Sequence, residues 1–221
     1  MILKDILYIL NSKFPYNQWP IRWTEVVDML ERCKQGVRVT SVIWKTPSTN
    51  RYKLNTDGTA LLNPEKIGGG GILRNEHGDM IYAFAIPLGE GTNNQAEAQA
   101  ANYGLHWCIQ HGYNKIILEV DSKLLTRWVL QTSTPPWRMQ KFVQELLKLV
   151  NKCMFFQCAH IYREANSTAD FLSKHSHIQD IIQHYYTYTQ LPNIVRGSYI
   201  LEKMGVQSFR RKKLKRIKEP P

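Results

Sequence analysis

Four carboxylates in short polar motifs are the residues of this sequence best suited to chemistry. They are Asp57 within residues 55–59, Glu97 within 93–98, Asp121 within 118–122 and Asp170 within 166–170. Hard divalent cations prefer oxygen ligands, and paired cations are a common means of cutting phosphodiesters. Each carboxylate also has an ordinary structural interpretation, as a turn residue, a solvated helix residue, a helix cap or a partner of a helix dipole. The order and spacing of the four motifs, taken together, therefore carry the prediction of a metal site.

The predicted secondary structure places these carboxylates where strands and helices begin and end. Apolar runs and turn signals predict strands at 52–57, 67–74, 80–87, 115–121 and 154–162, and helices at 96–110, 122–131, 137–151 and from about 166 onward. A hairpin followed by alternating elements indicates an α/β fold. Asp57 and Asp121 end strands whose carboxyl ends meet if the strands are parallel. Four acids at one place repel unless cations neutralise them, which is the physical case for metal.

The chain is long enough for one domain with extensions. We expect a helical lead-in or linker at 1–44, with one helix at 23–33, then a domain at 45–180 and a C-terminal extension at 181–221. The run Gly68 to Gly71 favours close backbone approach or a bulge over a phosphate loop, because no Lys-Ser/Thr follows it. Packing of the extension on the domain is favoured over base stacking by its tyrosines, Tyr185, Tyr186 and Tyr188.

The net charge of +11 favours an anionic partner, and much of it lies near the C-terminus. The basic tail comprises Arg210, Arg211, Lys212, Lys213, Lys215, Arg216 and Lys218. Such a run is typical of a solvated tail, and it also suits nucleic-acid contact or a nuclear import signal.

Cysteine usage and hydropathy narrow the expected cellular compartment of the protein. The four cysteines are too irregularly spaced for a disulfide framework or a zinc site, so buried free thiols in a reducing compartment are expected. No convincing signal peptide or membrane span is present, since Lys4 and Asp5 interrupt the first apolar run. We expect a monomer that is nuclear or cytoplasmic, not secreted, and without a membrane partner.

The ordered motifs resemble a type 1 ribonuclease H domain of the plant retroelement, reverse-transcriptase-associated kind. The resemblance lies in Trp44 with Pro47, and in residues 53–58, 69–73, 92–97, 119–122, 160–166 and 169–170. It implies a ribonuclease H-like α/β fold, a five-stranded mixed sheet flanked by helices. It further implies hydrolysis of the RNA strand of RNA/DNA hybrids with two Mg²⁺ ions, for which Mn²⁺ is a possible substitute.

The resemblance also assigns roles by position. Asp57 resembles the carboxylate that bridges both metals, Glu97 and Asp121 resemble ligands of the metal beside the leaving group, and Asp170 resembles a ligand of the metal that activates water. Candidate substrate-binding residues are Gly58, Thr92, Asn93, Asn94, Arg163 and Asn166. Thr92 would bind a DNA phosphate and Asn94 would read the minor groove, where 2′-hydroxyls mark RNA. Thr92 and its neighbours also suit a helix cap, and both roles can hold at once.

Two departures from the family pattern leave questions open. The stretch between Asp121 and Asp170 is short for the basic protrusion with which some members grip the hybrid. His160 has the offset from Asp170 of a catalytic loop histidine, yet it lies in strand-like sequence, so a buried strand histidine is an equal alternative, and Arg163 is a second candidate for its role.

The alternative function is a catalytically decayed, retroelement-derived module that binds nucleic acid without cutting it. The motif contexts argue against an exonuclease or an integrase.

Overall fold

The computed structural model describes residues 2–13, 15–33, 37–61 and 65–213. The chain divides into two compact units, one formed by residues 41–209 and the other by residues 1–40 with 210–221. The larger unit therefore extends past the domain boundary at 180 that the sequence suggested. The extension packs on the domain through Tyr185, Leu191, Val195 and Tyr199, as favoured above.

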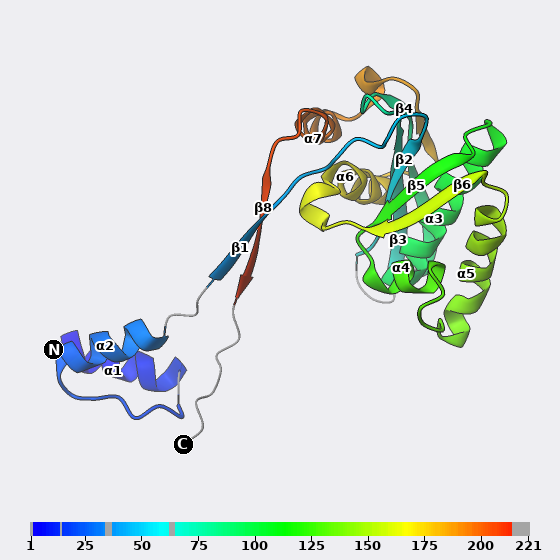
Figure 1. Cartoon of the computed structure of the whole chain (residues 1–221). Coiled ribbons are helices and arrows are strands. Elements are labelled where there is room, and N and C mark those ends of the chain that lie inside the picture. The colour runs from blue at the N-terminus through cyan, green and yellow to red at the C-terminus, as the bar shows by residue number, and fades with distance from the viewer. Residues whose placement is uncertain (1, 14, 34–36, 62–64, 214–221) are drawn as a thin grey trace. The chain divides into compact units, whose positions relative to one another are not determined.

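A six-stranded mixed sheet forms the centre of the larger unit, in the order β6-β5-β2-β3-β4-β7 (Figure 1). Its strands are β2 (Tyr52–Ala60), β3 (Glu65–Arg74), β4 (Met80–Gly91), β5 (Lys115–Val120), β6 (Phe155–His160) and β7 (Gln183–Tyr185). The mixed sheet is confirmed, but the expected count of five strands is wrong, because β7 adds an edge strand. Its three residues pair antiparallel with Ala83 to Ala85, and a strand so short leaves no readable alternation in the sequence.

The register of the central strands fixes where the carboxylates lie. β2 runs antiparallel to β3 and parallel to β5, with Thr56 opposite Val120. Asp57 and Asp121 are the next residues along these two strands, so both lie at the same end of the β2–β5 pair. The predicted parallel pairing is confirmed.

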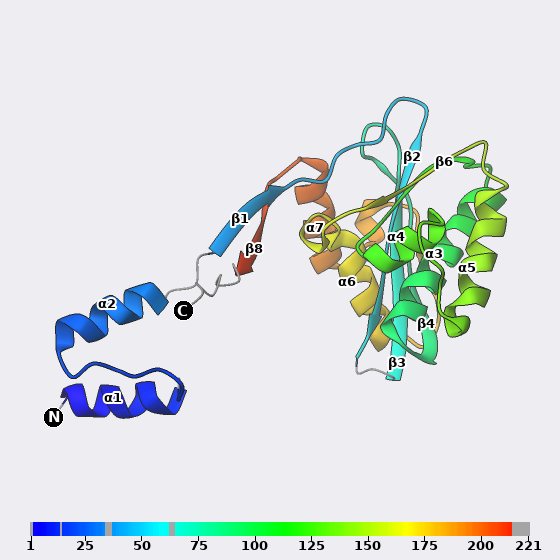
Figure 2. The ribbon, with the colours of Figure 1, turned by 60° about the horizontal axis from the view of Figure 1, so that its bottom comes forward.

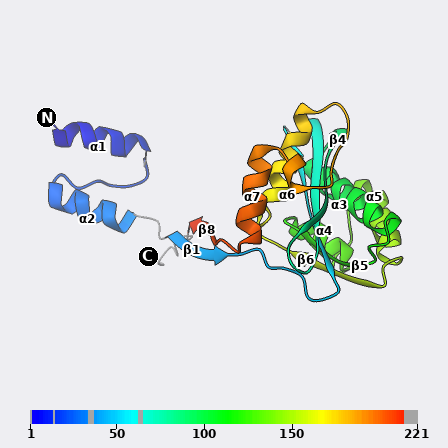
Figure 3. The same cartoon turned by 90° about the horizontal axis from the view of Figure 1, so that it is seen from above.

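Helices cover both faces of the sheet (Figures 2 and 3). They are α3 (Asn93–Gln110), α4 (Lys123–Val129) and α5 (Trp137–Val150) on one face, and α6 (Ser167–His175) and α7 (Asn193–Lys203) on the other. Successive side chains of a strand point to opposite faces of the sheet, and this separates two cores. In β3, Leu73 packs in the core with α3, whereas Ile72 packs with Leu172 of α6 and Tyr199 of α7. Short 3₁₀ turns η1 (Arg163–Ala165), η2 (Ser176–Ile178) and η3 (Tyr188–Gln190) complete the unit.

Glycines allow two helices to approach the sheet closely. A Cβ on Gly58 would lie 2.2 Å from the backbone of Ala96 and Glu97, and one on Gly70 would lie 2.3 Å from the backbone nitrogen of Ser173. A bulge also falls between Ile67 and Gly68. The prediction of close backbone approach and a bulge in this strand is therefore confirmed. The closeness brings α3 and α6, which carry Glu97 and Asp170, against β2.

The remaining segments contain α1 (Ile2–Lys13) and α2 (Trp23–Cys33), and β1 (Val37–Val42) pairs with β8 (Ser208–Lys213) in a two-stranded sheet. The predicted helix at 23–33 is confirmed, whereas α1 was not predicted. The first basic-tail residues belong to β8, and Lys215, Arg216 and Lys218 lie outside the described residues.

Within the described ranges no helix is long and apolar enough to span a bilayer. Cys108, Cys153 and Cys158 are free thiols, as expected; Cys108 and Cys158 are buried.

Candidate metal centre

Three carboxylates from three different elements converge. One oxygen each of Asp57, Glu97 and Asp121 lies within 4.8 Å of the others. Asp57 comes from β2, Glu97 from the first turns of α3, and Asp121 directly follows β5. A capping box at Thr92 and Gln95 defines the start of α3, and Gly58 lets that helix lie against β2. Local capping and close approach therefore bring Glu97 next to Asp57.

Asp170 joins this group through Arg163. Asp170 lies buried in the first turn of α6. The guanidinium of Arg163 lies 3.1 Å from Asp121 Oδ2 and 3.4 Å from Asp170 Oδ1 through Nε, and 3.9 Å from Asp57 Oδ1 through Nη2. A single cation thus contacts three of the four carboxylates. Lys174 of the next helical turn also meets Asp170 Oδ2, at 2.5 Å.

Burial and mutual repulsion shift the pKa values of the clustered carboxylates. Burial, and then the charge of Asp121, raise the pKa of Asp57 to about 8, although the Ser173 hydroxyl that donates to Asp57 Oδ2 lowers it. Burial, followed by the charges of Asp57 and Asp121, raises the pKa of Glu97 well above its usual range. Burial by itself would lower the pKa of Arg163, but the surrounding carboxylates raise it. For both Asp57 and Glu97 the main cause is burial, and repulsion by neighbouring carboxylates adds to it.

The donor set fits a hard divalent cation. Asp57 Oδ1, Glu97 Oε2 and Asp170 Oδ1 are buried, and none of them accepts a hydrogen bond from the described residues; Arg163 reaches two of them only as an ion pair. Buried acceptors without donors are costly, so native proteins rarely keep them without a reason. An all-oxygen set of carboxylates matches what Mg²⁺ and Mn²⁺ take as ligands. Asp57, Glu97, Asp121 and Asp170 are the residues that would hold such ions.

The residues expected to contact substrate divide into an accessible and a buried group. Asn93 is exposed, and Thr92 and Asn94 are half-buried, all at the start of α3. Thr92 serves as the helix cap, which was the structural half of its prediction. By contrast, Asn166 is buried: its amide nitrogen donates to Thr56 O at 3.0 Å and its oxygen accepts from Asn55 Nδ2 at 3.1 Å. Those contacts give Asn166 a structural task, and its contact with substrate stays a prediction, as does that of Gly58.

His160 ends β6, in register with Val120, the residue before Asp121. It is half-buried, and its ring meets that of Tyr162 edge-on at 5.2 Å. This position near Asp121, at the end of an edge strand, fits a catalytic histidine and a buried strand histidine equally well. Its catalytic role stays a prediction.

Sequence reasoning missed several contacts of the cluster. The bonds from Ser173 to Asp57 and from Lys174 to Asp170 were not predicted. The spacing of four between Asp170 and Lys174 on a predicted helix was an available signal for the second pair. The bridging position of Arg163 depends on the tertiary fold and has no local signal.

Comparison with known proteins gives the family and the fold. Residues 55–176 match the family model described as "Reverse transcriptase-like". The chain is 29% identical over 133 residues to "Putative ribonuclease H protein At1g65750" of Arabidopsis thaliana, a match that covers 60% of this chain and 22% of that relative. The chain thus spans about a fifth of that relative's length.

Solved structures of low sequence identity show the same fold. Ribonuclease H1 of the archaeon Halobacterium salinarum aligns with a TM-score of 0.56 and 23% identity, over 57% of this chain and 97% of that one. LC11-RNase H1, solved in complex with an RNA/DNA hybrid, aligns with a TM-score of 0.54 and 23% identity, over 57% of this chain and 96% of that one. The family match spans more than half of the chain, so the protein belongs to the reverse transcriptase-like family and has a ribonuclease H fold.

Proposed function

We propose that this chain is a metal-dependent endoribonuclease that hydrolyses the RNA strand of RNA/DNA hybrids. The observation that carries the proposal is the convergence of Asp57, Glu97 and Asp121 within 4.8 Å, with buried acceptor oxygens that accept no hydrogen bond from the described residues. A structural cluster would satisfy those oxygens internally. A cluster that binds cations must leave them available.

Asp57, Glu97, Asp121 and Asp170 are the carboxylates that would hold two divalent ions. Bound Mg²⁺, or Mn²⁺ in its place, lowers the pKa of an attacking water and stabilises the departing oxygen of a phosphodiester. The protein's own contribution is to fix the four side chains on β2, α3, β5 and α6, so that little reorganisation is needed. Arg163 is half-exposed, which leaves its side chain free to turn toward a phosphate when cations replace it.

Recognition of the hybrid would fall to the start of α3. Thr92 and Asn94 are half-buried and Asn93 is exposed, and all three lie within five residues of Glu97 along the chain. Polar side chains at a helix N-terminus suit phosphate and 2′-hydroxyl contacts. The solved structure of LC11-RNase H1 with a hybrid adds support at the level of the fold.

A second function, binding without cleavage, has one observation in its favour. Arg163 contacts three of the four carboxylates, so the chain already carries a cation at the cluster. In a decayed module this arginine would replace the metals permanently. The unpartnered oxygens and the raised pKa of Asp57 favour the enzyme over this alternative.

The test uses the full chain and three labelled substrates: an RNA/DNA hybrid, double-stranded RNA and single-stranded RNA, each with and without Mg²⁺. The proposal expects Mg²⁺-dependent internal cleavage of the RNA strand in the hybrid alone. Tight hybrid binding without products, in Mg²⁺ and in Mn²⁺, would establish the binding module instead.

A further inference from the structure

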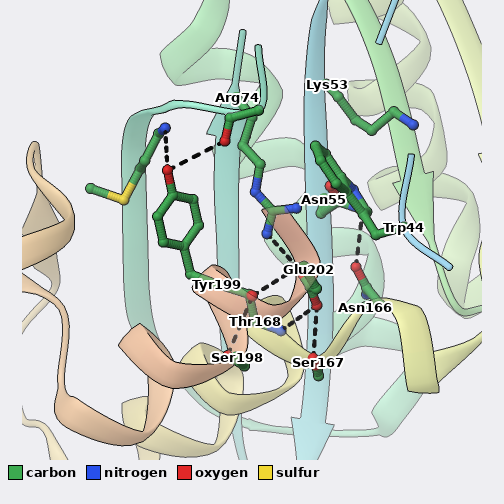
Figure 4. Close-up of polar contacts among 12 residues, drawn as sticks. Trp44, Lys53, Asn55, Arg74, Asn166, Ser167, Thr168, Ser198, Tyr199 and Glu202 are labelled. Carbon is green, nitrogen blue, oxygen red and sulfur yellow. Dashed lines mark hydrogen bonds and ion pairs between the residues drawn. The ribbon is translucent and has the colours of Figure 1, made fainter. Parts of the chain in front are cut away.

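Helix α6, which carries Asp170, begins without a cap of its own. Asn166 occupies its N-cap position, and its side chain makes no capping hydrogen bond. The first backbone N–H groups of a helix need acceptors, above all where they are buried. A carboxylate on another helix supplies one. Glu202 of α7, which is 6% exposed, accepts from Thr168 N at 2.9 Å, from Thr168 Oγ1 at 2.8 Å and from Ser167 Oγ at 2.8 Å (Figure 4).

A buried arginine holds Glu202 in this position. Arg74, at the end of β3, is fully buried and its Nη2 lies 2.5 Å from Glu202 Oε2. Its guanidinium carbon lies 4.3 Å from the ring centre of Trp44 and 5.7 Å from that of Tyr199. The Tyr199 hydroxyl in turn accepts from Met80 N and donates to Gly78 O, so α7 is fixed to the β3–β4 hairpin as well.

The same group of residues reaches β2 next to Asp57. Trp44 Nε1 donates to Asn55 Oδ1 at 2.9 Å, and Asn55 Nδ2 donates to Asn166 Oδ1 at 3.1 Å. Asn166 donates onward to Thr56 O, the residue before Asp57 (Figure 4 shows Asn166 beside Asn55 and Trp44). The start of α6 is therefore held from two sides, by Glu202 of α7 and by Asn55 and Thr56 of β2.

This double attachment bears on Asp170. The backbone N–H of Asp170 donates to Asn166 O, so the first helical hydrogen bond joins the carboxylate-bearing residue to the anchored cap. A shift of the α6 N-terminus changes the distance between Asp170 and Asp57. We propose that Glu202 and Arg74 are positioning residues for Asp170, so that α7 contributes to the geometry of the metal centre. The inference rests on the proposed function.

The family match ends at residue 176, so α7 lies beyond it. A merely structural role for α7 predicts that loss of the ion pair lowers stability and leaves metal binding unchanged. A positioning role predicts weaker metal binding in a protein that is still folded. Changes to groups that orient metal ligands typically weaken metal affinity by about 10–100-fold.

The experiment compares the wild type with the double variant Arg74→Met/Glu202→Leu. Well-packed apolar replacements of a buried ion pair often keep a protein folded, whereas removal of one partner leaves an unpaired charge. The matched control is Lys203→Ala on the same helix, which breaks the exposed ion pair with Asp79 and leaves Glu202 in place. Mg²⁺ is titrated into each metal-free protein, with amide NMR shifts as the readout and melting curves as the check of folding.

We expect the double variant to bind Mg²⁺ about 10-fold more weakly and the control to bind it as the wild type does. In the cleavage assay, the variant should need correspondingly more Mg²⁺, with an unchanged KM for hybrid at saturating metal. A folded double variant with wild-type Mg²⁺ affinity overturns the inference. If the wild type binds Mg²⁺ but cuts no hybrid, the proposed function fails, and the comparison of affinities still decides the role of α7.

If the double variant does not fold, Thr168→Val replaces it. This change removes one hydroxyl that donates to Glu202 and keeps the shape of the side chain. A smaller weakening of Mg²⁺ binding in the same direction supports the inference, and wild-type affinity overturns it.

Discussion

Two clusters of buried charge lie on either side of the first turn of α6, and they are built in opposite ways. Around Glu202 both carboxylate oxygens accept hydrogen bonds, and the buried Arg74 balances the charge, although its Nε and Nη1 form no hydrogen bond with the described residues. Around Asp57 three buried oxygens accept no hydrogen bond from the described residues, and Arg163, which forms ion pairs there, is half-exposed. The first arrangement stabilises one geometry, and the second leaves ligand atoms available. The contrast indicates that the Glu202 cluster fixes the position of α6, whereas the Asp57 cluster keeps ligand atoms available for a cation.

The largest effect on activity that we expect comes from the carboxylates around Asp57. Asp57→Asn should lower hybrid cleavage by about 10³-fold or more, because the central ligand loses its charge and a metal contributes several kcal/mol to transition-state stabilisation. Glu145→Gln, an exposed carboxylate on α5, is the control and should cleave normally. Single-turnover assays measure both. Cleavage by Asp57→Asn at the wild-type rate would show that the site is wrongly assigned.

Removal of the Glu202 carboxylate should lower stability, in addition to the effect on metal binding proposed above. Glu202→Ala leaves Arg74 buried and unpaired, and should lower the free energy of unfolding by about 3–5 kcal/mol. The double variant Arg74→Met/Glu202→Leu should recover most of that loss. Urea unfolding measures both. A loss below about 1 kcal/mol in Glu202→Ala would mean that the pair adds little to the fold.

His160 tests how far the functional cluster extends. If it handles a proton, His160→Ala should slow turnover by roughly 10–100-fold, at or below the usual range for general acid–base groups. The measurement is kcat at saturating hybrid and Mg²⁺, together with a melting curve. An unchanged kcat with a lowered Tm would place His160 in the core, next to Tyr162.

The smallest effect concerns the basic tail. Deletion of residues 209–221 should raise KM and flatten its salt dependence, because each neutralised phosphate contributes a slope of about 0.9 on duplex DNA. The value of kcat should barely change, since all four carboxylates remain. The deletion also removes most of β8, so a melting curve is the control. Equal salt slopes with and without the tail would rule out a grip on nucleic acid.

The sequence predicted the carboxylates of the site better than the contacts that hold them in place, for a physical reason. Asp57, Glu97, Asp121 and Asp170 each lie in a readable local motif, so the sequence could indicate them as a set, although β2 continues past Asp57 to Ala60 and does not end there as predicted. The bond between Arg74 and Glu202 joins residues far apart in the chain, and neither has a local motif. Likewise β7 is too short to show a period, and only its pairing with β4 defines it.

The most direct test of the account is the pH dependence of stability with and without Mg²⁺. The pKa of Asp57 is raised from 3.8 to about 8, so between those values the folded protein holds a proton that the unfolded chain releases. The free energy of unfolding of the metal-free protein should therefore fall as pH rises from about 4 to 8. Since Mg²⁺ binds the ionised carboxylates of the folded state, it should restore that stability above pH 8.

Asp57→Asn is the decisive comparison in this measurement. The substitution removes the titrating group, so at pH 8 without metal it should raise the free energy of unfolding, and Mg²⁺ should add little. The account predicts a variant that is more stable yet insensitive to metal. A variant that is less stable than the wild type at pH 8, or equally stabilised by Mg²⁺, would contradict the claim that these carboxylates are held for a cation.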